Sequence, residues 1–224
     1  PLLAISKQQQ AAIQTQLGEN YSVKLGMRYG NPSIASALRE LQSEGVRKIV
    51  VLPLYPQYAG PTTGSTFDAV AKAFKDWRWV PELHFINNYC DEPLYIDALA
   101  NSVREHIEKN GKPQKIIFSY HGTPKRNLEL GDPYYCLCIK TTRLVAERLG
   151  LNKDDYMACF QSRFGYAEWL KPYTDETLRN LPAEGIKNVA ILSPAFSADC
   201  LETLEELAVE NRHTFMEAGG EQYQ

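Results

Sequence analysis

The chain has 224 residues, of which 44% are hydrophobic and 23% charged, and these proportions are typical of an ordinary globular protein. This length suffices for one large or two small α/β domains. The formal net charge of −3 gives no basic excess, which argues against nucleic acid as the main partner. No apolar run approaches the roughly 18 residues of a membrane span, and no signal peptide is visible. Peripheral contact with a membrane stays open.

The five cysteines do not form the pattern of a disulfide framework. An odd count without an export signal favours reduced thiols in the cytoplasm. Cys136 and Cys138 could suggest a metal site, but no second cysteine pair accompanies them, so we expect neither zinc nor an iron–sulfur cluster there. The chain opens without a methionine and stops soon after Gly219-Gly220, so we expect both ends to be truncated.

Strands and helices are expected to alternate along the whole chain. Three of the helices are expected to begin at capping side chains, namely Ser6, Ser65 and Asp199. The expected strands are 21–29, 48–55, 82–89, 115–120, 156–163 and 188–196, and the expected helices are 6–17, 31–44, 65–77, 92–110, 134–149, 174–181 and 199–216. Such alternation predicts parallel βαβ units.

An internal similarity suggests two related halves. The stretches Glu44–Leu52 and Glu184–Leu192 each combine a helix end, a glycine, a polar turn and a buried strand. We therefore expect two similar α/β lobes, residues 1–92 and 93–224, each with a parallel sheet flanked by helices. A chance similarity between two short junctions is the alternative. Two such lobes would place a cleft between the carboxyl ends of their strands.

The first candidate for chemistry lies at a strand end. The apolar run Ile116–Phe118 stops at Ser119-Tyr-His121, and Gly122 and Pro124 then break the chain direction. A histidine at the carboxyl end of a parallel strand sits where open α/β sheets bind ligands. A histidine that merely ends a strand is the competing interpretation, and it has about even odds from this stretch alone.

Four strand ends would line the expected cleft. They carry aromatic residues, one arginine, one histidine and one acid: Arg28, Tyr29, Tyr55, Tyr58, Tyr120, His121, Phe196 and Asp199. This combination suits a flat apolar ligand that bears some charge. For any single tyrosine, an ordinary position at the rim of the sheet is the simpler interpretation.

The last expected helix carries three acids at spacing i, i+3, i+7, namely Asp199, Glu202 and Glu206, so their carboxylates would share one face. Capping and the helix dipole explain Asp199, explain Glu202 in part, and leave Glu206 unexplained. A row of carboxylates could instead pass a hydrated divalent cation or protons. His121 facing Glu202 would form a proton-transfer or metal-handling pair. No nucleotide-binding glycine motif is present.

These segments together resemble the ferrochelatase family, in particular its bacterial members. The resemblance rests on Ser119–Pro124, Gly131–Tyr134, Phe160–Gly165, Trp169–Asp175 and Phe196–Leu204, with Arg28-Tyr29 and Leu54–Tyr58 in the first half. It implies a lyase that inserts Fe²⁺ into protoporphyrin IX and releases two protons in the last step of haem biosynthesis. It implies two Rossmann-like lobes around a porphyrin cleft, and no cofactor beyond the substrate iron.

Carried over to this sequence, the resemblance implies His121 and Glu202 as the catalytic pair. The metal would be handled by His121, Glu202, Asp199 and Glu206, and the porphyrin would contact Arg28, Tyr29, Tyr55, Tyr120 and Phe196. Two departures stand out. The family's first strand and the strand after the last helix are missing, and Cys200 stands where some members carry a histidine.

Competing functions keep the fold but change the chemistry. A cobalt or nickel chelatase for a more carboxylated tetrapyrrole would want more basic residues than Arg28, Lys125 and Arg126. A non-catalytic porphyrin or metal carrier would bind without turnover. Coproporphyrin is an alternative substrate within the family. We expect a cytoplasmic protein, with loose association to a membrane left open, and the sequence does not specify an oligomeric state.

Overall fold

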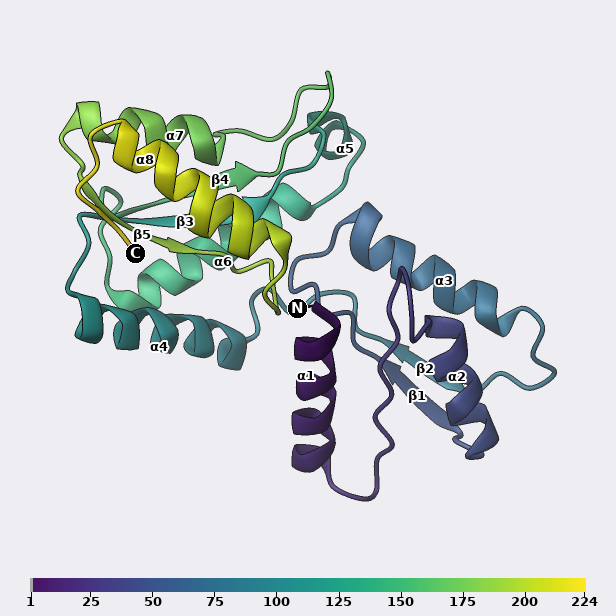
Figure 1. Cartoon of the computed structure of the whole chain (residues 1–224). Coiled ribbons are helices and arrows are strands. Elements are labelled where there is room, and N and C mark those ends of the chain that lie inside the picture. The colour runs from purple at the N-terminus through teal and green to yellow at the C-terminus, as the bar shows by residue number, and fades with distance from the viewer. Residues whose placement is uncertain (1) are drawn as a thin grey trace. The chain divides into compact units, whose positions relative to one another are not determined.

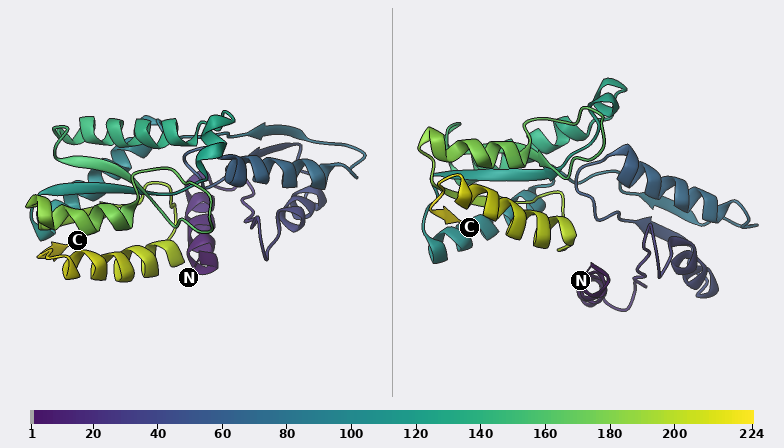
Figure 2. Two further views of the ribbon diagram at one scale, coloured as in Figure 1. Left: turned by 90° about the horizontal axis from the view of Figure 1, so that it is seen from above. Right: turned by 45° about the horizontal axis from the view of Figure 1, so that its top comes forward.

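The computed structural model describes residues 2–224, which form two compact units (Figure 1, Figure 2). The first unit ends at Asn88 and the second spans Tyr89–Gln224, so the division falls near the one expected after residue 92. Within both units the paired strands run parallel, which confirms the predicted α/β fold class. No helix among the described residues is long and apolar enough to cross a bilayer.

The first unit is built on a two-stranded parallel sheet. Its elements are α1 (Leu2–Leu17), α2 (Ile34–Ser43), β1 (Lys48–Val51), the short π-helical turn η1 (Gly60–Gly64), α3 (Ser65–Phe74) and β2 (Glu82–Phe85). The side chains of α2, β1 and α3 form its core: Leu38, Ile49, Val70 and Phe74. Helix α2 starts at Ile34, three residues later than expected, because the hydroxyl of the N-cap residue Ser33 accepts a hydrogen bond from the backbone N–H of Ser36 at 3.1 Å.

The second unit is a four-stranded parallel sheet in the order β4-β3-β5-β6. Its elements are α4 (Pro93–Asn110), β3 (Lys115–His121), α5 (Lys125–Glu129), α6 (Tyr134–Leu149), β4 (Tyr156–Gln161), α7 (Thr174–Asn180), the 3₁₀ turn η2 (Leu181–Glu184), β5 (Asn188–Leu192), the π-helix η3 (Glu202–Asn211), α8 (Arg212–Glu217) and β6 (Gln222–Tyr223). Figures 1 and 2 show α4 and α6 on one face of this sheet, and α7, η3 and α8 on the other.

The central strand β3 divides its side chains between these two layers, because successive residues of a strand point to opposite faces. Ile117 packs in a buried cluster with Leu178 of α7 and Phe215 of α8. Tyr120 belongs to the opposite face, where its hydroxyl lies 2.8 Å from that of Thr142 on α6. Ser119 and His121 follow Ile117 and therefore emerge on the side of α7 and η3.

The segment 21–29, which we predicted to be a strand, has none; it forms only an isolated bridge at Met27. Side chains of α1 satisfy its backbone in place of a neighbouring strand. Gln10 donates to the carbonyl of Val23 at 2.8 Å, and the backbone N–H of Val23 donates to Gln14 at 2.9 Å. A strand needs such backbone partners, and here glutamines have taken them.

Other boundaries also differ from the prediction. Ser6 lies buried inside α1 and does not cap it. Ser65 is preceded by η1, and Gly64 holds the N-cap position of α3. The strand that we expected to be missing after the last helix is present as β6, which pairs with β5. The last helix begins with the π-helix η3, which no local sequence pattern announced.

The two similar junctions adopt the same local geometry. Gly45 and Gly185 have φ angles of +71° and +87°, a region that favours glycine. The next residue closes the turn in each case, since Val46 N–H donates to the Leu41 carbonyl at 3.1 Å and Ile186 N–H to that of Leu181 at 3.0 Å. The sequence similarity therefore corresponds to a structural one.

The core of the second unit gives a first testable prediction. Leu178 is 0% exposed on α7, whereas Leu94 on α4 is 78% exposed. Leu178→Ala should lower the free energy of unfolding by about 2 to 5 kcal/mol, because it leaves a cavity against β3 and α8. Leu94→Ala, the matched control, should change it by less than about 0.5 kcal/mol. Urea unfolding measures both, and equal midpoints would contradict this account of the core.

Candidate active site at the carboxyl edge of the second sheet

His121 is the last residue of β3, and its ring is held in one tautomer. Its Nδ1 lies 2.7 Å from the carbonyl oxygen of Gly122. A carbonyl oxygen can only accept, so Nδ1 carries the hydrogen and the neutral ring keeps a lone pair on Nε2. The Tyr134 hydroxyl donates to the carbonyl of His121 at 2.9 Å. These two hydrogen bonds therefore fix both the ring and the backbone of His121.

Aromatic side chains surround the His121 ring. The ring centroids of Trp169 and Phe196 lie 6.4 Å and 6.3 Å from its own. Gly122 makes room for the indole, because a Cβ there would lie 3.0 Å from Cε3 of Trp169 and 2.9 Å from the carbonyl oxygen of Gln161. The result is a histidine with an apolar flank, which suits a flat aromatic ligand.

Glu202, the first residue of η3, is electrostatically coupled to His121. A hydrogen bond from the Cys200 thiol, together with attraction from His121, lowers the pKa of Glu202, although partial burial opposes this. Burial, reinforced by the Glu202 carboxylate, raises the pKa of Cys200 to about 11. Glu202 is therefore a carboxylate that stays ionised to lower pH than an ordinary glutamate, and its pairing with His121 stays a prediction.

Glu206 makes hydrogen bonds to the end of β4 that we did not predict. Its carboxylate accepts hydrogen bonds from the backbone N–H of Ser162 at 2.6 Å, from the Ser162 hydroxyl, and from the amide of Gln161 at 3.2 Å. Ser162 has a φ of +61°, a costly conformation for a residue with a side chain. The carboxylate of Glu206 thus fixes the end of β4 to η3.

Asp199 is exposed and does not cap the helix through a backbone N–H; its Oδ1 accepts a hydrogen bond from the Thr203 hydroxyl at 3.0 Å. The helical spacing that we assumed for Asp199, Glu202 and Glu206 is also wrong, because η3 is a π-helix. Within residues 2–224, no group of three or more His, Cys, Asp and Glu side chains is placed to hold a metal ion. The four predicted metal-handling residues are therefore not gathered into one ligand set.

The predicted porphyrin contacts do not all lie beside His121 either. Phe196 is partly exposed beside His121. Tyr120 is 0% exposed and faces α6, so the structure does not bring it to this site. The reason is the alternation of β3, which sends neighbouring residues to opposite faces. Burial raises the pKa of Tyr120 well above the ordinary value, so its hydroxyl stays protonated.

The remaining predicted contacts lie together in the first unit. Arg28 donates from Nε to the Ser65 hydroxyl at 2.8 Å and to the Ser65 carbonyl at 3.0 Å. Its guanidinium carbon lies 4.6 Å from the centroid of the Tyr29 ring. Burial, with a contribution from Tyr29, raises the pKa of Tyr55, while Arg28 opposes the shift. These three residues form one cluster, with Tyr29 74% exposed.

Several residues that the sequence analysis did not single out shape the site. They are Tyr134, Gln161, Ser162 and Trp169. Gln161 and Ser162 follow β4 directly, so they share the carboxyl edge with His121, and that position was a signal available in the sequence. Tyr134 and Trp169 lie in segments that carry the family resemblance, but no pattern assigned them a role at the site, because their roles depend on tertiary packing.

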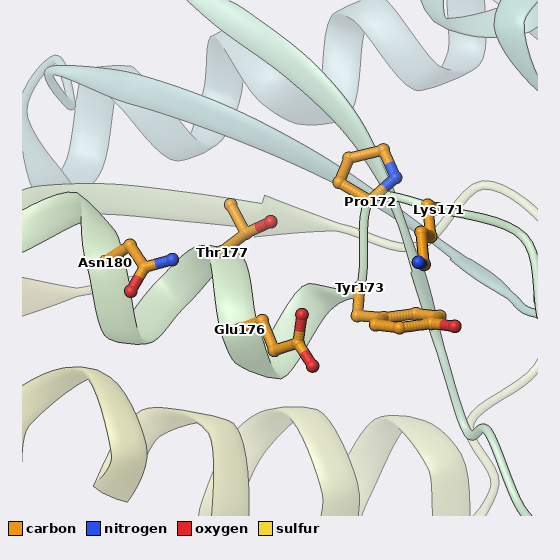
Figure 3. A pocket seen from close by; sticks show the side chains of 6 residues that line it. All are labelled: Lys171, Pro172, Tyr173, Glu176, Thr177 and Asn180. Atoms are coloured by element: carbon orange, nitrogen blue, oxygen red, sulfur yellow. The ribbon is translucent and has the colours of Figure 1, made fainter.

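Two other features lie apart from these residues. Cys136 is exposed and Cys138 is buried on the same helix, α6, so the two thiols do not face one ligand. A surface hollow of about 420 Å³ runs along α7 and is lined by Lys171, Pro172, Tyr173, Glu176, Thr177 and Asn180 (Figure 3). The ring of Tyr173 lies beside Arg163, whose guanidinium carbon is 4.0 Å from its centroid. None of the predicted site residues lines this hollow.

Comparison with known proteins places the fold and then the family. SirB from Bacillus subtilis with Fe³⁺ superposes with a TM-score of 0.65 over 97% of this chain and 81% of that structure, at 14% identity. The fold is therefore of the chelatase type. A ferrochelatase family model matches residues 1–224, the whole chain. The chain belongs to the ferrochelatase family.

Curated relatives support this assignment. Ferrochelatase 2 of Shewanella oneidensis is 61% identical over the whole chain, which spans 69% of that protein. The ferrochelatases of Hydrogenovibrio crunogenus and Pseudoalteromonas atlantica are 56% and 52% identical, and the chain spans 60% and 63% of their lengths. The resemblance read from the sequence motifs is thus confirmed at the level of the family.

The environment of Cys200 predicts unusual thiol chemistry. The thiolate is the reactive form, so a pKa of about 11 in place of the ordinary 9.0 should keep Cys200 poorly reactive at neutral pH. Its alkylation rate should still be rising at about pH 10, where an ordinary thiol has levelled off. Iodoacetamide labelling followed by mass spectrometry measures this profile. Glu202→Gln should move the profile to lower pH, and a wild-type plateau near the ordinary value would contradict the assignment.

The role of Glu206 predicts a stability difference between adjacent acids. Glu206→Ala removes an ionised acceptor from three donors and should cost about 2 to 3 kcal/mol of unfolding free energy. Glu205→Ala is the matched control, because Glu205 is exposed on the same helix, and it should cost less than about 0.5 kcal/mol. Urea unfolding at neutral pH distinguishes the two variants. An equal effect of both substitutions would refute the stabilising role of the Glu206 hydrogen bonds to Ser162 and Gln161.

Proposed function

We propose that the protein is a ferrochelatase that inserts Fe²⁺ into protoporphyrin IX to form protohaem. The observation that carries this proposal is the pairing at the sheet edge, where His121 has a free Nε2 lone pair beside the ionised Glu202. Membership of the ferrochelatase family supports it. Iron and protoporphyrin IX are both substrates, and no resident cofactor is needed.

The reaction replaces two pyrrole protons by one Fe²⁺, so charge and atoms balance when two protons leave. His121 is the residue that accepts a pyrrole proton, because Nδ1 is occupied by the Gly122 carbonyl and Nε2 keeps its lone pair. The imidazolium formed in this step is stabilised by the Glu202 carboxylate. The same imidazole then returns the proton to solvent before the second transfer.

Glu202 must stay ionised for this role. Its pKa is lowered by the Cys200 hydrogen bond and by His121, so the carboxylate keeps its charge to lower pH than an ordinary glutamate. A fixed negative charge at this point favours both the imidazolium and an approaching Fe²⁺. Asp199, exposed a short way along the chain, is the proposed outer contact for the hydrated metal.

Aromatic side chains are the proposed contacts of the macrocycle. Phe196 is the proposed contact beside His121. Arg28, Tyr29 and Tyr55 also remain proposed substrate-binding residues, and within the first unit they form one cluster. One guanidinium in that cluster suits a porphyrin with few carboxylates, which favours protoporphyrin over more acidic tetrapyrroles.

We also infer a cytoplasmic location. The reduced side chains of Cys90, Cys138 and Cys159 are buried in the second unit as small apolar groups. Such thiols suit a reducing compartment.

The decisive experiment follows metal insertion under anaerobic conditions. Purified protein is mixed with protoporphyrin IX and Fe²⁺, and the porphyrin spectrum is recorded for the wild type, His121→Ala and Glu202→Gln. Each substitution should lower kcat by at least about a hundredfold, because each removes a group that touches the reacting atoms. Porphyrin binding should persist, since the aromatic contacts remain.

His213→Ala is the matched control. His213 is exposed and pairs with Glu217 on α8, so its loss should leave kcat within about twofold. If the wild type bound porphyrin without turnover, the enzymatic function would be refuted and the alternative of a porphyrin carrier would remain. Insertion of Co²⁺ or Ni²⁺ into a more carboxylated tetrapyrrole, with protoporphyrin ignored, would refute the substrate assignment.

A further inference from the structure

The amide of Gln161 joins the strand of His121 to the helix of Glu202. Its Oε1 accepts a hydrogen bond from the Ser119 hydroxyl on β3 at 2.7 Å. Its Nε2 donates to the backbone carbonyl of Glu202 at 3.0 Å and to the Glu206 carboxylate at 3.2 Å. One side chain of β4, 3% exposed, thus contacts both β3 and η3.

The orientation of this amide follows from its partners. The nitrogen faces two acceptors, a carbonyl and a carboxylate, and the oxygen faces a hydroxyl. The reversed orientation would set the amide oxygen of Gln161 against two other oxygens in a buried place, which is unfavourable. The hydrogen-bond pattern therefore admits one arrangement.

The register of the sheet places the Gln161 side chain beside those of β3. His121 on β3 and Gln161 on β4 are paired residues of parallel neighbours, so their side chains emerge on the same face. Ser119 lies two residues before His121 and shares that face. Since Gln161 holds the first carbonyl of η3, it sets where Glu202 stands relative to His121.

We propose that Gln161 is a positioning residue: its buried amide holds the Glu202 end of the π-helix against the strand that carries His121, and Glu206 anchors that amide. Gln161 itself touches neither substrate nor metal. The inference rests on the proposed function for its catalytic consequence, whereas its structural part stands on the hydrogen bonds alone. It also gives Glu206 a place in the site that is independent of any contact with iron.

The test compares Gln161→Met with Thr174→Val. Methionine keeps the length of glutamine and removes its hydrogen bonds. Thr174 is 1% exposed and its hydroxyl lies 2.9 Å from that of Ser119, at the far end of the same network, but it does not bond to η3. Both variants lose a buried polar contact, and only Gln161→Met releases the helix.

The first readout is hydrogen–deuterium exchange of the peptide that covers residues 201–207. Exchange there should be faster by about tenfold or more in Gln161→Met and unchanged in Thr174→Val, because only the former loses the bond to the Glu202 carbonyl. Equal protection in Gln161→Met and the wild type would overturn the inference. This readout does not depend on activity.

The second readout is steady-state metal insertion. Gln161→Met should lower kcat by about tenfold to a hundredfold, because a small displacement of Glu202 weakens the pairing with His121. KM for porphyrin should stay within about twofold, and Thr174→Val should match the wild type. In a Glu202→Gln background, Gln161→Met should cost no more than about twofold. A loss confined to KM, or one shared by Thr174→Val, would overturn the inference.

A second substitution guards against a failure to fold. Gln161→Asn keeps a neutral amide but is one methylene shorter, so it cannot bridge the Ser119 hydroxyl and η3 as Gln161 does, and it should show the same exchange and kcat effects. Wild-type protein without any turnover would refute the proposed function. The exchange experiment would then still decide whether Gln161 holds the helix.

Discussion

The carboxylate of Glu206 fixes the π-helix that carries Glu202 to the end of β4, and the site depends on that attachment. Glu206 accepts from both the backbone and the hydroxyl of Ser162 and from the amide of Gln161. These charge-assisted bonds offset the left-handed backbone of Ser162. A π-helix is rarely longer than a single turn, so a run over Glu202–Asn211 needs such tertiary support.

Around that attachment, the site separates rigid from reactive groups. The carbonyls of Gly122 and His121 are each occupied by a hydrogen bond, from His121 Nδ1 and from Tyr134, so the imidazole has little freedom to turn. The reactive atoms are the remaining ring nitrogen and the carboxylate of Glu202. Partial burial and neighbouring groups change the pKa of the Glu202 carboxylate. Among the described residues, this carboxylate is not part of a preformed group of three or more metal ligands. This division suits a metal that passes through the protein as substrate.

Much of the fold could be predicted because its signals are local. The apolar run of β3 and the glycine turns at Gly45 and Gly185 carry their conformations in a few adjacent residues. The position of His121 followed from the rule for parallel strand ends. Tyr120 was misplaced although alternation along the same strand assigns it to the other face, so that error was avoidable.

The rest could not be predicted because it depends on distant partners. The segment 21–29 has a strand-like composition, but glutamines of α1 occupy its backbone. The π-helical hydrogen bonding of η3 is selected by Glu206 and Ser162, which lie in different elements. The sequence alone does not show whether an acidic residue in a helix caps the helix, binds a metal or fixes a neighbouring strand. For Glu206, only its contacts in the structure identify the role.

The π-helix has a consequence for how this segment tolerates changes in length. Its N–H groups bond five residues back, so each turn holds one residue more than α-helical bonding requires. Removing one residue between Glu202 and Glu206 would allow α-helical bonding in that turn, with no loss of its backbone hydrogen bonds. It would also shorten the spacing between the Glu202 carbonyl, which binds Gln161, and the Glu206 carboxylate, which binds Ser162. The number of residues in this stretch is thus constrained more tightly than the identity of its exposed ones.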